Sequence, residues 1–413
     1  MALDWGFEFL NGLQKLFLNP LFYYLFIVAG LLGFSRVKRE RKQFHVRAKD
    51  PFFEIRQLLP LGFVLGLILS VVTIAAGLVI PIETVIFAAL FTFLWSLTTN
   101  FRFLSPVYTI GFAFFATLFF LSKKWSLPLI ESHTPEWNQS ILPPIAALLG
   151  LLIIAEGILI FRNGRKGTSP KLVKGRRGLR VGVHEVKRLW MLPLFLIIPG
   201  EALQVPFEWW PVFSVGGQTY SILLVPFAIG YYQQIQGKLP VLAVMQAGKK
   251  IVKFGIVLTC LSVVGYWYPL ASIVLVALAI IGRELLSMRQ RLVEDNLPFY
   301  FSQRNHGVMI LGVIPDSPAE KMGLDVGEVV FKVNGVTITD EESFYEAMQK
   351  NRAHCKLEVF DVNEQVRFVQ RALYEGDHHQ LGILFVQNEK KWEDEVAVAK
   401  EQSDLGYTNH FPE

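Results

Sequence analysis

The sequence has only two cysteines among its 413 residues, Cys260 in an apolar run and Cys355 near the other end. This scarcity excludes a disulfide-rich scaffold and leaves no cysteine cluster for a metal. Charged residues are also few, at 18% against about 25% in an average soluble protein, whereas 52% of the residues are hydrophobic and 34 are Phe. The composition therefore excludes a single soluble globule, and it excludes a disordered chain.

The formal net charge of +5 is an average over two unlike parts of the chain. Residues 1–282 hold 26 Lys and Arg against 12 Asp and Glu, a net charge of +14, and residues 283–413 hold 14 against 23, a net charge of −9. We therefore predict a membrane region and a separate C-terminal part. The expected divisions are a multi-span region at 1–282, a helical linker at 283–298, a small domain at 299–388 and an acidic, disordered tail at 389–413.

Long apolar runs predict an α-helical polytopic membrane region of seven to nine spans, because a helix needs about 20 apolar residues to cross hydrocarbon about 30 Å thick. The runs lie at approximately 16–34, 58–80, 84–99, 103–122, 141–161, 189–207, 211–232, 251–267 and 269–282. No cleavable signal peptide is expected, since the first five residues carry no basic side chain and no small-residue cleavage site follows the first run.

Basic connections predict the orientation of this region. The segments 35–57 and 162–188 are rich in Lys and Arg, and such loops stay on the cytoplasmic side. Both segments could also bind anionic lipids or an acidic protein, although positive-inside topology alone explains their charge. We therefore expect a multi-pass protein of the cell membrane with a cytoplasmic C-terminal domain. Nine spans would place the N-terminus outside the cell. No nucleic-acid partner is expected.

After residue 306 the pattern changes to short β-like segments separated by turn signals, at 308–313, 329–333, 357–360, 366–373 and 381–386. An amphipathic helix is expected at about 341–350, because Thr339-Asp340 forms a good N-cap before it. The segment 307–335 contains a Ser317-Pro318-Ala319 helix start, a Gly323-Leu324 helix exit and an Asn334-Gly335 hairpin turn. In this order the elements resemble the PDZ domain, which implies a small α+β fold.

The PDZ resemblance implies that a partner peptide binds by strand addition beside a helix. Permuted bacterial PDZ domains carry their carboxylate-binding loop, Leu-Gly-Ile, at the end of the domain. The matching segment of this chain comprises Leu381, Gly382, Ile383, Leu384 and Phe385. The predicted groove runs between this segment and helix 341–350, with Phe344 and Met348 among its lining. The alternatives are that the segment is only a closing strand and that Phe344 and Met348 belong to the core.

Motifs of catalysis are missing from the sequence, so no catalytic residue, metal ligand or cofactor is predicted. The nearest approach to a His-Glu-x-x-His zinc motif, at 184–188, lacks the second histidine, and no Gly-x-Ser-x-Gly pentapeptide occurs. A PDZ-bearing membrane protease or protease cofactor remains an alternative. An ion-coupled transporter is another, because Glu201 follows Pro199-Gly200 inside an apolar run.

The whole chain resembles the MinJ family of division-site regulators in Gram-positive, endospore-forming bacteria. The resemblance begins at residues 1–6 and 19–24, includes the multi-span architecture and ends with the PDZ-like domain. It implies a membrane-anchored scaffold, enriched at septum and poles, that bridges a DivIVA-like polar protein to MinD, the ATPase that recruits the division inhibitor MinC. Contacts with other division proteins are implied as well. The residues themselves predict the anchor and the binding domain, whereas these partners come from the resemblance alone.

Overall fold

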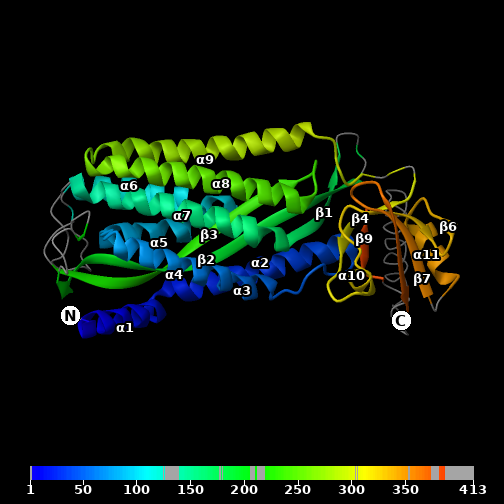
Figure 1. Ribbon diagram of the computed structural model, residues 1–413, viewed down its shortest axis with the longest axis horizontal. Helices are drawn as coiled ribbons and strands as arrows, with labels where there is room; N and C mark the ends of the chain where they lie inside the picture. Colours follow the sequence, from blue (N-terminus) through cyan, green and yellow to red (C-terminus); the bar gives the residue numbers. More distant parts are fainter. Residues whose placement is uncertain are drawn as a thin grey trace, which may run out of the picture.

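An elongated bundle and a smaller β-rich domain at one end of it make up the molecule (Figure 1). The computed structural model describes residues 2–123, 125, 139–175, 178, 180–204, 210–211, 219–302, 304, 306–351, 354–373 and 381–386. The acidic tail predicted at 389–413 lies outside the described residues. The side chain of Glu201, the residue of the transporter alternative, lies outside them too.

Nine α-helices are described in the bundle, and most of them run along its length (Figure 1). They are α1 (Ala2–Leu18), α2 (Pro20–Phe44), α3 (Phe53–Leu58), α4 (Pro60–Ala75), α5 (Ile82–Leu97), α6 (Pro106–Ser122), α7 (Leu142–Arg162), α8 (Pro240–Ser262) and α9 (Ala271–Asn296). Four stretches are long and apolar enough to cross a membrane: Pro20–Phe44, Phe53–Ala75, Gln139–Arg162 and Ala271–Asn296. The chain is thus a membrane protein, and the count of seven to nine spans remains a prediction.

Two of the predicted helical spans are strands. Within the apolar runs at 189–207 and 211–232, residues 189–204 lie in β2 (Arg180–Gln204) and residues 219–232 lie in β3 (Thr219–Ile235). The two strands pair antiparallel, with Leu189 opposite Gly230. The short strand β1 (Thr168–Lys174) pairs with the start of β2. Figure 1 shows β2 and β3 passing through the middle of the bundle, between helices. The prediction of an entirely α-helical membrane region was therefore wrong.

Proline explains why these two runs are not helical. Pro193 lies within β2, Pro199 stands at a register shift of β2, and Pro226 lies in β3 opposite Pro193. A proline in a helix interior removes a hydrogen bond and costs about 3 kcal/mol or more. In an antiparallel pair, a proline without an N–H can be accommodated where the ladder does not need that donor. The length of an apolar run alone cannot distinguish a membrane helix from a buried β-strand.

Helix α4 covers one edge of β2 in a matched register. A Cβ added to Gly62 or to Gly66 would come within 2.1 Å of the carbonyl oxygens of Met191 and Pro193. One turn further, the Ser70 hydroxyl accepts a hydrogen bond of 2.9 Å from the backbone N–H of Phe195. Four helical residues rise about 6.0 Å and two strand residues about 6.7 Å, so the two repeats stay in step. The Gly-xxx-Gly pair thus packs a helix on a strand.

The open edges of the β2–β3 pair need such a covering helix if the pair lies inside a membrane region. Unpaired backbone groups in hydrocarbon cost several kcal/mol each, so open sheet edges there must be covered by protein. The Thr73 hydroxyl donates to the carbonyl of Phe195 (3.2 Å), and the Glu8 carboxylate accepts from the N–H of Ile222 (3.3 Å). Helices α1 and α4 therefore satisfy edge groups of the hairpin with their own side chains.

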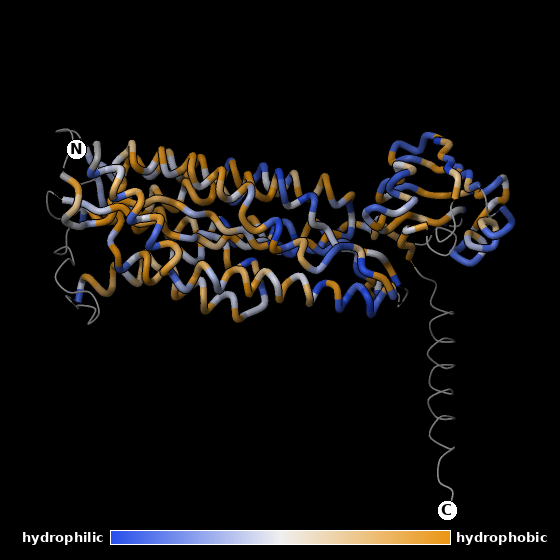
Figure 2. Tube along the Cα trace, turned by 90° about the horizontal axis from the view of Figure 1, so that it is seen from below, coloured by the Kyte–Doolittle hydropathy of each residue, from blue (hydrophilic) through white to orange (hydrophobic). Residues whose placement is uncertain are grey.

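Buried ion pairs join the helices near the end that carries the small domain. Arg283 of α9, 2% exposed, donates to Glu156 of α7 at 2.7 Å, and Glu156 also accepts from the Ser105 hydroxyl at 2.7 Å. Glu54 of α3 accepts from Arg36 at 2.6 Å and from Arg188 at 3.0 Å. Figure 2 shows the bundle as mainly apolar, with hydrophilic residues gathered toward this end. The charges are thus concentrated on the side of the predicted cytoplasmic connections.

Candidate peptide groove of the C-terminal domain

The C-terminal domain consists of a six-stranded β-sheet and two helices. Its strands follow the order β8–β7–β5–β4–β9, and β6 pairs with β5. The elements are β4 (Val308–Val313), α10 (Pro318–Lys321), β5 (Val329–Val333), β6 (Val336–Thr337), α11 (Glu341–Gln349), β7 (His354–Phe360), β8 (Val366–Ala372) and β9 (Ile383–Phe385). Strand β9 ends the path and pairs only with β4 among the described strands. Its outer edge is the place where a further strand could add.

The helix caps and the hairpin turn that the sequence predicts are present in this domain. The Ser317 hydroxyl accepts from the N–H of Glu320 at the start of α10, and Asp340 accepts from the N–H of Ser343 (2.8 Å) in a capping box at the start of α11. Hydrogen bonds from this cap hold the pKa of Asp340 below its usual value. Asn334 and Gly335 both have positive φ, 50° and 83°, as a type I′ hairpin turn requires.

A groove of about 90 Å³ lies beside β9 and α11. It is lined by Phe44, Val46, Ile314, Glu341, Tyr345, Gly382, Ile383, Leu384 and Phe385. Sites for drug-sized ligands span about 300–1,000 Å³, so this groove has the size to receive only a side chain or a chain end. No cationic side chain is among its described lining residues. An acidic chain end would therefore have to be bound by backbone N–H groups.

The structure places four of the seven predicted site residues in the groove and the other three in the core of the domain. Gly382, Ile383, Leu384 and Phe385 line the groove as one wall. The remaining three, Leu381, Phe344 and Met348, are buried in the core of the domain, with 0%, 0% and 2% of their surface exposed. Helix α11 presents Glu341 and Tyr345 to the groove instead. These two lie four residues apart on one helix face, which is the signal that could have identified them.

Gly382 holds the turn that precedes β9. Its φ is +86°, and an added Cβ would lie 2.3 Å from the Cβ of Ser317. Its carbonyl accepts from the N–H of Ile314 (2.8 Å), and the carbonyl of Leu381 accepts from the N–H of Ala319 (2.9 Å). A side chain at this position would therefore strain the domain as well as block the groove.

The groove has a second wall from the membrane region. Phe44 is the last residue of α2 and Val46 follows the helix end, where His45 has a φ of 58°. Phe44 packs in a cluster with Leu172, Phe301, Met309, Leu311 and Leu384, which we call the domain junction. The domain is therefore docked on the membrane region through apolar contacts, and the docking contributes to its groove.

Backbone and side-chain hydrogen bonds reinforce the domain junction. His184 of β2, which precedes the apolar run of that strand, donates from Nε2 to the carbonyl of Leu311 at 2.9 Å. The N–H of Gly182 donates to the carbonyl of Phe301 at 2.8 Å. The imidazole is 1% exposed, and burial lowers its pKa from 6.5 to about 4. His184 is therefore neutral near pH 7 and has a structural role at the junction.

Taken together, the bundle, the strand order and the edge groove define a membrane protein with a docked PDZ domain. The model of the PDZ domain family matches residues 309–359. The cell division topological determinant MinJ of Bacillus subtilis is 38% identical over 400 residues, covering 97% of this chain and 100% of that protein. A probable cell division topological determinant MinJ of Lacticaseibacillus paracasei is 25% identical over 390 residues, covering 91% of this chain and 98% of that protein.

The chain therefore belongs to the MinJ family of cell division topological determinants. This membership places it in division-site selection, and it confirms the predictions of a MinJ-like protein and of an adaptor rather than an enzyme. The predictions of a PDZ domain, of membrane helices and of a role in cell division are confirmed as well.

Proposed function

We propose that this protein is a multi-pass scaffold of the cell membrane that recruits division proteins through its PDZ groove on the cytoplasmic side. Residues 381–385 accept an extended partner segment along the free edge of β9, next to Glu341 and Tyr345 of α11. The observation that carries this proposal is the groove itself, which combines an edge strand, a neighbouring helix and a wall from the membrane anchor. A partner bound there would be held at the membrane surface.

The partners follow from the family resemblance. A DivIVA-like polar protein would place the scaffold at septa and poles, and MinD would be retained beside it. Confinement to a small membrane area raises the effective concentration of a partner without requiring a strong pairwise affinity. A docked domain suits this mechanism, because docking keeps the groove close to the membrane anchor that sets its position.

Imaging and binding assays test the proposal together. A fluorescent fusion of the full chain is expected at septa and poles of dividing cells, and uniform membrane fluorescence would refute the division-site role. Tyr345→Lys places a charge in the groove and is expected to abolish recruitment of MinD in a two-hybrid assay. Glu346→Gln makes the same change in net charge on the exposed side of α11 and is the matched control. Unchanged recruitment by the Tyr345 variant would remove the groove from the mechanism.

A further inference from the structure

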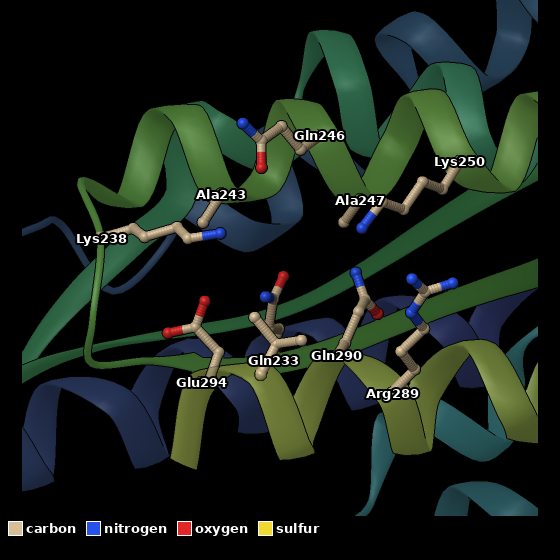
Figure 3. A pocket seen from close by; sticks show the side chains of 10 residues that line it. Gln233, Lys238, Ala243, Gln246, Ala247, Lys250, Arg289, Gln290 and Glu294 are labelled. Carbon is tan, nitrogen blue, oxygen red and sulfur yellow. The ribbon is translucent and has the colours of Figure 1, made fainter. Parts of the chain in front are cut away.

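A second groove lies on the membrane region between the start of α8 and the end of α9. Three cations from three different segments line it: Lys238 before α8, Lys250 on α8 and Arg289 on α9. Figure 3 shows their charged ends directed into the space between the two helices. The groove holds about 40 Å³, several times the 10–15 Å³ that one water molecule needs, so it is not closed by packing.

The positive charge of this groove is not balanced within the described part of the chain. No described residue forms a hydrogen bond or ion pair with Lys238, Lys250 or Arg289. The one acid of the lining, Glu294, is 7% exposed, and its Oε2 accepts from the N–H groups of Gln236 and Gly237, each at 3.1 Å. Three cations therefore face one carboxylate that is already bound to the backbone.

Neutral donors complete the lining. Gln233 of β3 and Gln290 of α9 reach the same space from below (Figure 3). The Tyr231 hydroxyl donates to Oε1 of Gln233, which leaves the NH₂ group of that amide as a donor for a ligand. Helix α8 begins at Pro240 beside the groove, and the positive end of its dipole also favours an anion. Cations, amide donors and a helix start suit a phosphate group.

The surroundings indicate how that phosphate is presented. Leu242 on α8 and Met288 and Leu292 on α9 are 52%, 55% and 52% exposed. Exposed apolar side chains beside a basic groove are expected where acyl chains cover the surface. The groove also lies toward the end of the bundle that carries the PDZ domain, where the basic connections gather (Figure 1). Basic recesses between membrane helices at the cytoplasmic side are typical sites for anionic lipid headgroups.

We propose that the α8–α9 groove binds the phosphate of an anionic phospholipid of the inner leaflet. Lys238, Lys250 and Arg289 contact the phosphate oxygens, and the acyl chains lie against Leu242 and Met288. The groove does not include any residue of the PDZ groove. A loss of lipid binding can therefore be distinguished from a loss of partner recruitment.

The test uses the full chain in detergent with dioctanoyl phosphatidylglycerol, dioctanoyl phosphatidylcholine and inorganic phosphate as separate probes, followed by native mass spectrometry or thermophoresis. The groove variant combines Lys238→Gln, Lys250→Gln and Arg289→Gln. We expect it to lose about 100-fold in affinity for phosphatidylglycerol, since each cation in contact with the bound phosphate contributes roughly fivefold. The control variant combines Lys249→Gln, Lys253→Gln and Arg291→Gln, removes the same charge from α8 and α9 outside the lining, and should lose less than threefold.

Each outcome decides the assignment. Strong binding of phosphatidylglycerol that depends on the groove cations, with weak binding of inorganic phosphate, supports a lipid headgroup. Groove-dependent binding of inorganic phosphate of equal strength assigns the site to a soluble phosphate and overturns the lipid. Equal losses in both triple variants reduce the effect to general surface charge and overturn the site. Loss of an acidic protein partner with unchanged lipid binding would identify the groove as a protein contact instead.

Discussion

Acidification is predicted to loosen the domain junction through His184. The imidazole donates from Nε2 to Leu311, and Nδ1 is buried without a hydrogen-bond partner in the described part of the chain. A proton on Nδ1 would therefore create a buried charge with an unsatisfied donor. Because burial lowers the pKa from 6.5 to about 4, the protein with an exposed His184 binds the proton more readily. The contribution of neutral His184 to docking is complete above pH 6.5 and is lost as the pH falls toward 4.

The size of this effect follows from the two pKa values. One pKa unit corresponds to about 1.4 kcal/mol, so the difference between 6.5 and about 4 gives a total of about 3 kcal/mol. By pH 5 about 2 kcal/mol of it is lost. Undocking of the PDZ domain would expose the ring to solvent, and the population of undocked molecules should then rise by about 30-fold between pH 7.5 and 5.

Spin labels can measure this population directly. We would label cysteines placed at Met288 on α9 and Gln349 on α11, both exposed, after replacing Cys260 by Ser. A narrow distance distribution is expected at pH 7.5 and an added broad component at pH 5. The control is His184→Gln, whose amide can still donate to Leu311 but does not titrate. Equal broadening in that variant at pH 5 would refute the role of His184.

Three further predictions concern stability. Gly382→Ala should lower the free energy of unfolding of the PDZ domain by about 2–4 kcal/mol, whereas Gly335→Ala, with equal strain but open space, should cost only about 1–2 kcal/mol in chemical denaturation. Glu156→Gln should destabilise the chain by about 3–5 kcal/mol by leaving the buried Arg283 unpaired, and Asp50→Asn, in the exposed pair with Arg56, by about 1 kcal/mol or less. Gly66→Val should prevent close packing of α4 on β2 and lower the thermal midpoint in detergent.

The PDZ domain could be predicted in detail because its signals are local. The predicted strands at 308–313 and 329–333 have the same bounds in the structure, and the predicted helix at 341–350 differs from α11 by one residue. Each of these elements is specified by a cap, a turn glycine or an alternation within a few residues. Such signals do not depend on what the rest of the chain does.

The membrane region was predicted less well, because apolar length reports burial and not secondary structure. A run of about 20 apolar residues fits a membrane helix, but β2 is buried by surrounding helices and needs the same composition. Pro193, Pro199 and Pro226 were the available evidence against helices. The wall that α2 contributes to the PDZ groove had no sequence signal, since Phe44 and Leu384 are far apart in the chain and come together only in the domain junction.

The distribution of ion pairs changes which basic segment is available to an external anion. By sequence, the connections 35–57 and 162–188 are the most basic and would be the first candidates for lipid binding. In the structure, several of their cations are held by acids of the same region: Arg36 and Arg188 by Glu54, and Arg39 and Lys171 by Glu185.

The α8–α9 groove has fewer cations, but Lys238, Lys250 and Arg289 are left without such acids in the described structure. Binding of an outside anion depends on uncompensated charge rather than on the number of basic residues. Lipid attraction is therefore expected at this groove as well as at the basic connections. The paired connections instead fix α2, β1 and β2 together beneath the PDZ domain.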